Sequence, residues 1–202
     1  MSKVDHNKQQ KRNSLLDSAF SLFIRNGFSK TSISDIVNAA GVAKGTFYLY
    51  FKDKYDIRNP LISHKASQVF LAAYTELQKH EDIVDFEDQV LFIIDNILNQ
   101  FSENHSLVML ISKHLSWGFF TNSLIETPDK DVPAVYTIYQ ELLAKSSHTY
   151  RDPELMMYMI LELVSGVSYN TILYEQPLPL AKIKEPLYKV LRSIFRQYRV
   201  EG

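Results

Sequence analysis

Apolar residues recur at the three- and four-residue spacing of an α-helix along almost the whole chain. Residues 8–26 carry Leu15, Leu16, Ala19, Phe20, Phe23 and Ile24 on one such face. The same spacing returns near residues 84–104, 106–117, 132–148, 153–174 and 180–199. The two-residue alternation typical of a half-buried strand does not compete with it. The chain is therefore predicted to be all-α, with about nine helices.

Two of the predicted helices are very short and are separated by a glycine. Ser32 and Asp35 have the spacing of a capping box, so the first is expected to begin there and to end at Gly41. The second covers residues 43–50. Helices of two turns are marginal alone and must pack on a neighbour, here the long helix that ends at Gly27. Three helices in this order, with a tight glycine-containing turn, are the helix-turn-helix arrangement.

A proline marks the start of the helix that follows. Pro60 lies inside a helical pattern, and proline is tolerated at the first helical position but disrupts a helix interior. Asn59 is therefore predicted as the N-cap and Pro60 as the first helical residue, after a separate turn. A kink at Pro60 is the alternative.

Composition excludes several classes of protein. Hydrophobic residues make up 46% of the 202 positions, as in a folded domain, and there is no cysteine for a disulfide or a thiolate metal site. The first fourteen residues are polar, unlike a signal peptide, and no stretch approaches the roughly 18 apolar residues of a membrane span. We expect a cytoplasmic protein with no membrane contact and no cofactor.

Charge is distributed unevenly along the chain. Residues 1–55 hold nine Lys or Arg against four Asp, a net charge of +5, whereas the remainder holds thirteen basic and nineteen acidic residues, a net charge of −6. A basic N-terminal segment on an acidic body suits a module that meets phosphates. Lys8, Lys11 and Arg12 are expected either to fray as a tail or to touch the DNA backbone or minor groove.

The second short helix is the candidate DNA reader. In a helix-turn-helix, the second helix enters the major groove by its N-terminal residues, which here are Ala43, Lys44, Gly45 and Thr46. Small side chains permit close approach to the bases, and a lysine can donate to guanine. Phosphate contacts, which fix the position of a protein along the duplex, are predicted for Thr31, Tyr48, Tyr50 and Lys54. Ser32 is also predicted to bind DNA. The two tyrosines could instead be ordinary surface residues.

The stretch TSISDIVNAAGVAKGTFYLYFKDKYDI resembles the DNA-binding domain of the TetR family of bacterial regulators. The resemblance spans roughly residues 10–58, including a glycine-threonine-aromatic-tyrosine pattern that starts at Gly45 and ends in Lys-x-Lys at Lys54. It implies DNA contacts by Thr31, Lys44, Gly45, Thr46, Tyr48, Tyr50 and Lys54. Pro60 departs from the uninterrupted fourth helix that is usual in the family.

The C-terminal part is predicted to form the dimer. The resemblance implies a dimer through the last two helices, and their apolar surface is wider than one small core requires. The predicted interface residues are Met159, Ser165, Gly166, Leu187, Leu191 and Ile194. Burial of both helices within one subunit is the alternative.

A small-molecule site is expected in the same C-terminal part, because its aromatic and methionine residues suit an adaptable apolar pocket. The candidates are Trp117, Phe120, Tyr139, Met157, Glu162 and Tyr169, although aromatic residues at helical spacing are often simply core. The dispersed histidines have no partner at the spacing of a metal site.

The sequence thus predicts a helix-turn-helix DNA-binding domain at residues 1–53 and a larger ligand-sensing and dimerisation domain at residues 54–202. The predicted function is a homodimeric transcriptional repressor that binds a palindromic operator in double-stranded DNA and is released by a small molecule. The chain shows no phosphate-binding glycine loop and no nucleophile motif, so an enzyme is not expected. The alternative is a helical interaction or enzymatic domain whose N-terminal module does not read DNA.

Overall fold

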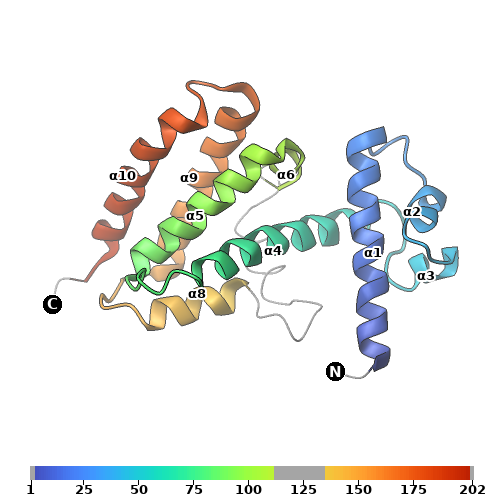
Figure 1. The fold of residues 1–202 in the computed structure, drawn as a ribbon, viewed down its shortest axis with the longest axis horizontal. Helices are drawn as coiled ribbons and strands as arrows, with labels where there is room; N and C mark the ends of the chain where they lie inside the picture. The colour runs from blue at the N-terminus through green and yellow to red at the C-terminus, as the bar shows by residue number, and fades with distance from the viewer. Residues whose placement is uncertain (1–2, 112–134, 201–202) are drawn as a thin grey trace. The chain divides into compact units, whose positions relative to one another are not determined.

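The computed structural model describes residues 3–111 and 135–200, and nine helices lie within them (Figure 1). They are α1 (Lys3–Asn26), α2 (Ile33–Ala39), α3 (Lys44–Tyr48), α4 (Arg58–Leu77), α5 (Phe86–Glu103), α6 (His105–Ile111), α8 (Val135–Ala144), α9 (Pro153–Tyr174) and α10 (Leu180–Tyr198). The only extended pairing in these residues is an isolated antiparallel bridge between Tyr150 and Arg199. The predicted all-α fold is confirmed.

The described chain forms two compact units. Unit 1 is residues 3–66, and unit 2 is residues 67–111 together with 135–200. Helix α4 passes from unit 1 into unit 2, so unit 1 contains the first nine residues of α4 as well as the three N-terminal helices.

Unit 1 is built around the face that α1 turns toward α2 and α3. Ile36 and Val37 of α2, Phe47 of α3 and Phe51 after it are all buried, as are Leu15, Leu16 and Ala19 of α1. The capping box at the start of α2 is present: Ser32 Oγ accepts from the Asp35 amide, and the Asp35 carboxylate accepts from the Ser32 amide. The turns before and after α2 contain Gly27 and Gly41 at φ +83° and +66°, where a β-carbon is disfavoured.

Three helix boundaries in unit 1 differ from the sequence prediction, and one of them is the end of α3, which comes at Tyr48 rather than at residue 50. Helix α1 begins at Lys3 rather than near residue 8, so Lys8, Lys11 and Arg12 are helical. Helix α4 begins at Arg58, which places Pro60 in its first turn, where the missing amide proton would have no partner within the helix.

In unit 2, helices α5, α9 and α10 pack against one another, α6 packs on α5 and α9, and α8 packs on α5 (Figure 1). The core is apolar and includes Phe86, Leu98, Ile138, Ile160 and Phe195. By length and composition α9 could cross a membrane, but 33% of its apolar stretch is buried inside the protein. The large apolar side chains that α9 exposes are Leu155, Met159 and Tyr174.

Candidate nucleic-acid interface

Helices α2 and α3 are joined by a four-residue turn that fixes their mutual orientation. The amide of Gly41 donates to the Asn38 carbonyl at 3.2 Å, and the amide of Val42 donates to the Val37 carbonyl at 3.0 Å. Helix α1 packs on both short helices, and Ser14 of α1 donates to the Ala40 carbonyl at the end of α2. Unit 1 is thus a helix-turn-helix braced by a long helix.

The predicted base-reading residues come together at the start of α3. Ala43 is the N-cap of this helix, Lys44 and Gly45 follow it, and all three are exposed, while Thr46 is half-buried. A β-carbon added to Gly45 would meet no atom within 4 Å, and its φ is not in the positive region that favours glycine. The fold itself therefore does not require glycine at position 45, although a surface that approaches another molecule closely would.

Two aromatic neighbours in α3 face in opposite directions. Phe47 is fully buried and contacts Phe51, whereas the side chain of Tyr48 is 52% exposed. Leu49, directly after the helix, is 79% exposed and was not among the residues predicted to contact DNA. Its apolar spacing alone did not distinguish it from a core residue.

Thr31 and Ser32 use their hydroxyl groups within the protein. The side chain of Thr31 is 1% exposed, and its hydroxyl donates to the carbonyls of Gly27 at 2.9 Å and Leu22 at 3.3 Å. The hydroxyl of Ser32 donates to Asp35 at 2.7 Å in addition to capping α2. Both residues therefore hold the turn between α1 and α2.

Tyr50 and Lys54 also have partners inside unit 1. The Tyr50 hydroxyl donates to the carbonyl of Lys8 in α1 at 2.9 Å. The Lys54 ammonium donates to the carbonyls of Phe28 at 2.8 Å and Ser29 at 3.3 Å, and lies 4.7 Å from the centre of the Phe28 ring. The contact from Lys54 ties the segment after α3 to the turn that precedes α2.

A charged cluster joins α1 to the first half of α4. Asp17 Oδ1 lies 2.7 Å from Lys65 Nζ and 3.2 Å from His64 Nε2. The hydrogen bond with His64, followed by that from Lys65, lowers the pKa of Asp17 to about 2, although partial burial opposes the shift. The carboxylate is therefore held ionised at the seam between these two helices.

The residues predicted for ligand binding do not share one surface of unit 2. Tyr139 and Met157 are buried, and the Tyr139 hydroxyl donates to the Pro153 carbonyl at 2.8 Å. Burial raises the pKa of Tyr139 well above its ordinary value. Glu162 is exposed and Tyr169 is half-buried beside Tyr174. Trp117 and Phe120 lie outside the described residues.

The residues predicted for the dimer interface divide into two groups. Leu187 and Leu191 are buried within unit 2, at 4% and 0% exposure, where they pack inside their own subunit. Met159 and Gly166 are exposed, and Ser165 and Ile194 are half-buried. An exposed and largely apolar stripe follows α9 through Leu155, Met159, Glu162, Gly166, Asn170 and Tyr174.

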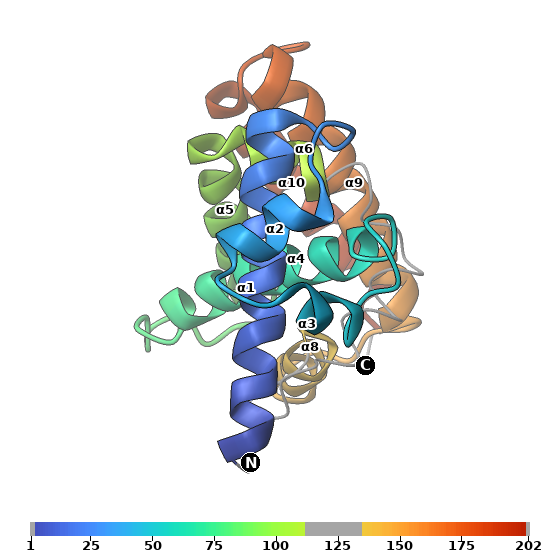
Figure 2. The same cartoon turned by 90° about the vertical axis from the view of Figure 1, so that its right-hand side faces the viewer.

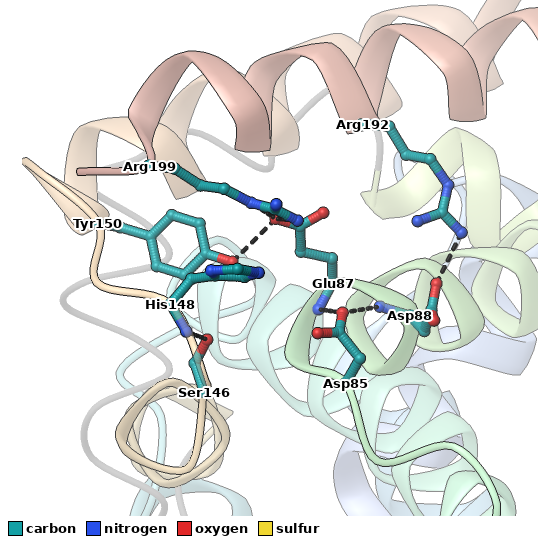
Figure 3. A network of polar contacts seen from close by, with 8 residues as sticks. All are labelled: Asp85, Glu87, Asp88, Ser146, His148, Tyr150, Arg192 and Arg199. Atoms are coloured by element: carbon teal, nitrogen blue, oxygen red, sulfur yellow. Dashed lines mark hydrogen bonds and ion pairs between the residues drawn. The ribbon is translucent and has the colours of Figure 1, made fainter. Parts of the chain in front are cut away.

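A buried carboxylate, that of Glu87, lies in the first turn of α5 and faces Arg199 at the end of α10 (Figure 3). Glu87 is 3% exposed and accepts hydrogen bonds from Arg199 at 2.7 Å and from the Tyr150 hydroxyl at 2.9 Å. Asp85, the N-cap of α5, accepts from the Glu87 amide. Within the described residues, no group of three or more His, Asp or Glu side chains is placed to hold a metal ion.

Comparison with known proteins gives a family match in unit 1 and a relative of known role. Residues 15–59 match the family described as bacterial regulatory proteins, tetR family. The fatty acid metabolism regulator protein of Bacillus subtilis is 30% identical over 108 residues, which cover 54% of each chain. The chain therefore spans about half the length of this curated relative.

Solved structures resemble the fold over most of its length. A tetR-family transcription regulator from Shewanella sp. PV-4 matches with a TM-score of 0.64 and 16% identity, covering 95% of this chain and 99% of that one. The regulator FadR of B. subtilis, solved in complex with stearoyl-CoA, matches with a TM-score of 0.55 and 20% identity, covering 88% and 96%. At such identities the likeness establishes the shared fold.

Proposed function

The chain belongs to the TetR family of bacterial regulatory proteins, and we propose that it is a homodimeric repressor that leaves its operator when a small molecule binds. In this proposal residues 1–53 read DNA, and residues 54–202 form the dimer and sense the ligand. The protein acts in the cytoplasm, where its operator is. The observation that carries the proposal is the exposed start of α3, where Ala43, Lys44 and Gly45 stand on a braced helix-turn-helix inside the family match.

The proposed base contacts come from Lys44, with Ala43 and Gly45 permitting close approach and Thr46 beside them. Tyr48 is the proposed phosphate contact, because its side chain is exposed next to this surface. Thr31, Ser32 and Lys54 support the reader by holding the turn before α2. Their hydroxyl and ammonium groups are buried or already hydrogen-bonded within the protein. Contacts from this turn to phosphate are therefore proposed for its main chain.

The dimer supplies two readers to a palindromic operator. Successive major grooves on one face of DNA lie about 34–36 Å apart, so the two copies of α3 must match that spacing. A ligand that prefers a dimer with another spacing lowers DNA affinity, with a coupling on the order of 1–3 kcal/mol. The stearoyl-CoA in the B. subtilis FadR structure makes a long-chain acyl thioester the first ligand to test, with Tyr139 and Met157 as the buried candidates for contact.

The test is selection of duplexes from a random-sequence library by the full-length protein, followed by fluorescence anisotropy. We expect a palindromic site and binding that weakens when stearoyl-CoA is added. Lys44→Ala should lower discrimination between the selected site and a scrambled duplex by about 10-fold. Lys52→Ala, an exposed lysine beyond α3, is the matched control and should preserve discrimination. A protein that binds no duplex at low ionic strength contradicts the proposal.

A further inference from the structure

One face of α1 changes from basic to apolar along its length. Residues 8, 12, 15, 19 and 22 recur at the three- and four-residue spacing that places side chains on one side of a helix. From Leu15 onward this face is buried where α1 packs on α2 and α3. Before Leu15, the same face carries Lys8 and Arg12, with Lys11 beside them. The basic groups therefore point to the side of α1 on which α3 lies.

The first turns of α1 contribute no buried side chain to unit 1. Within residues 3–13 every side chain is exposed or half-buried, and both views show α1 running on past α3 toward the N-terminus (Figures 1 and 2). The charges here are Lys3, Lys8, Lys11 and Arg12 against Asp5. An isolated helical extension is marginally stable, so its position depends on specific contacts.

Two contacts hold these turns against the segment that follows α3. The Tyr50 hydroxyl donates to the Lys8 carbonyl at 2.9 Å. The Arg12 guanidinium lies 5.9 Å from the centre of the Phe51 ring, within the range of a cation–π interaction. Burial lowers the pKa of Arg12, and the nearby Tyr50 opposes this shift. Tyr50 and Phe51 thus fix the start of α1 beside the reader helix, while the side chains of Lys8 and Lys11 stay exposed.

We propose that the first three turns of α1 form a second DNA-binding surface beside α3, in which Lys8 and Lys11 bind backbone phosphates and Tyr50 and Arg12 are positioning residues. This inference rests on the proposed function of the chain as a DNA-binding regulator. Lysine ammonium groups bind phosphate as point charges, and such contacts add affinity and register without reading bases. The surface thereby extends the contact beyond the major groove that α3 enters.

The salt dependence of DNA affinity measures how many phosphates this surface contacts. Each phosphate that a protein neutralises on duplex DNA contributes about 0.9 to the slope of log affinity against log salt concentration. Two lysines in each subunit of a dimer therefore account for a slope of up to about 3.6. The experiment compares the full-length protein with Lys8→Ala/Lys11→Ala on the selected operator, by anisotropy over a series of KCl concentrations.

The double variant should lower the slope by up to about 3.6 and leave discrimination against a scrambled duplex unchanged. Lys79→Ala/Lys145→Ala removes the same charge from unit 2 and should keep the wild-type slope. Alanine is a strong helix former, so the double variant should retain its helical circular dichroism. A double variant with the slope of this control overturns the α1 surface while leaving the proposed function intact.

Tyr50→Phe tests the positioning role separately. The variant keeps the ring but loses the hydrogen bond to the Lys8 carbonyl, so Lys8 and Lys11 of both subunits should lose their phosphate contacts. The slope of log affinity against log salt concentration should then fall by at least about 1. If Tyr50→Phe weakens binding but keeps the wild-type slope, its neutral hydroxyl contacts the DNA itself, and the positioning role is overturned. Failure of the wild-type protein to bind any duplex refutes the proposed function instead.

Discussion

Arg199 donates to the buried carboxylate of Glu87 at 2.7 Å, across 112 positions of the chain. The Tyr150 hydroxyl donates to the same oxygen, and burial together with this hydrogen bond raises the pKa of Tyr150 to about 12 (Figure 3). The start of α5, the segment before α9 and the end of α10 therefore meet at one carboxylate. The charge of Glu87 is compatible with burial because both partners donate to it.

Arg199→Ala should lower the free energy of unfolding by about 2–3 kcal/mol, because it leaves a buried carboxylate with a single neutral donor. The chain offers a matched control in Arg192→Ala. Arg192 pairs with Asp88 at 2.6 Å, but both side chains are about half exposed, so the loss should stay below about 1 kcal/mol. Urea unfolding of the two variants measures the difference. Equal losses of unfolding free energy in the two variants would show that burial of Glu87 does not strengthen its ion pair with Arg199.

Asp17→Asn should remove an acid-dependent part of the stability. The folded pKa of Asp17, about 2, lies below the ordinary value of 3.8, so its ionised form favours the folded state. This contribution is complete above about pH 4 and is lost as the pH falls through about 2. Asp17 is partly exposed, and after allowance for solvent screening we expect about 1 kcal/mol.

The measurement is the unfolding free energy of wild type and Asp17→Asn between pH 5 and pH 2. The two curves should converge at the acid end of this range. Asp82→Asn, at an exposed position in the segment between α4 and α5, should instead run parallel to wild type. Curves for Asp17→Asn that also stay parallel to wild type would refute the assignment of this acid dependence to the Asp17 cluster.

In the proposed dimer through α9 and α10, Val190→Glu should favour the monomer without unfolding it. Val190 is 49% exposed on α10, one turn from exposed Pro186, and a charge there opposes burial against a second subunit. Val84→Glu, at a valine that is 77% exposed before α5, makes the same chemical change outside helices α9 and α10. Light scattering coupled to size-exclusion chromatography reports the mass. A Val190→Glu protein that remains dimeric at micromolar concentration places the interface elsewhere.

Local rules predicted much of unit 1 from the sequence. The capping box at Ser32 and the glycines at positions 27 and 41 are determined by neighbouring residues, and the structure has all three features as expected. Helical spacing also placed Leu15, Leu16 and Ala19 on one face of the first helix, and all three are buried. Periodicity therefore predicted the fold, and the helix-turn-helix arrangement identified the start of α3 as an exposed surface.

The partners of individual side chains could not be predicted in the same way. Helical spacing gives the face on which Tyr50 lies, but the carbonyl of Lys8 is 42 positions away and becomes its partner only when α1 and α3 pack. The apolar residues of α10 raise a second difficulty. Leu191 and Val190 have similar hydrophobicity. An apolar side chain gains the same free energy whether its own subunit or a partner subunit covers it, so the sequence does not say which of the two will. Only the packing distinguishes them, and it buries Leu191.

The bridge between Tyr150 and Arg199 also changes how α10 can open. Helix ends ordinarily fray first, since their last hydrogen bonds break independently of the core. Here the Arg151 amide donates to the Tyr198 carbonyl, and the Val200 amide donates to the Thr149 carbonyl. Unwinding the last turn of α10 would therefore also break these two backbone hydrogen bonds and separate Arg199 from the carboxylate of Glu87. Amide hydrogens at this terminus should exchange with solvent together with those of the core of unit 2.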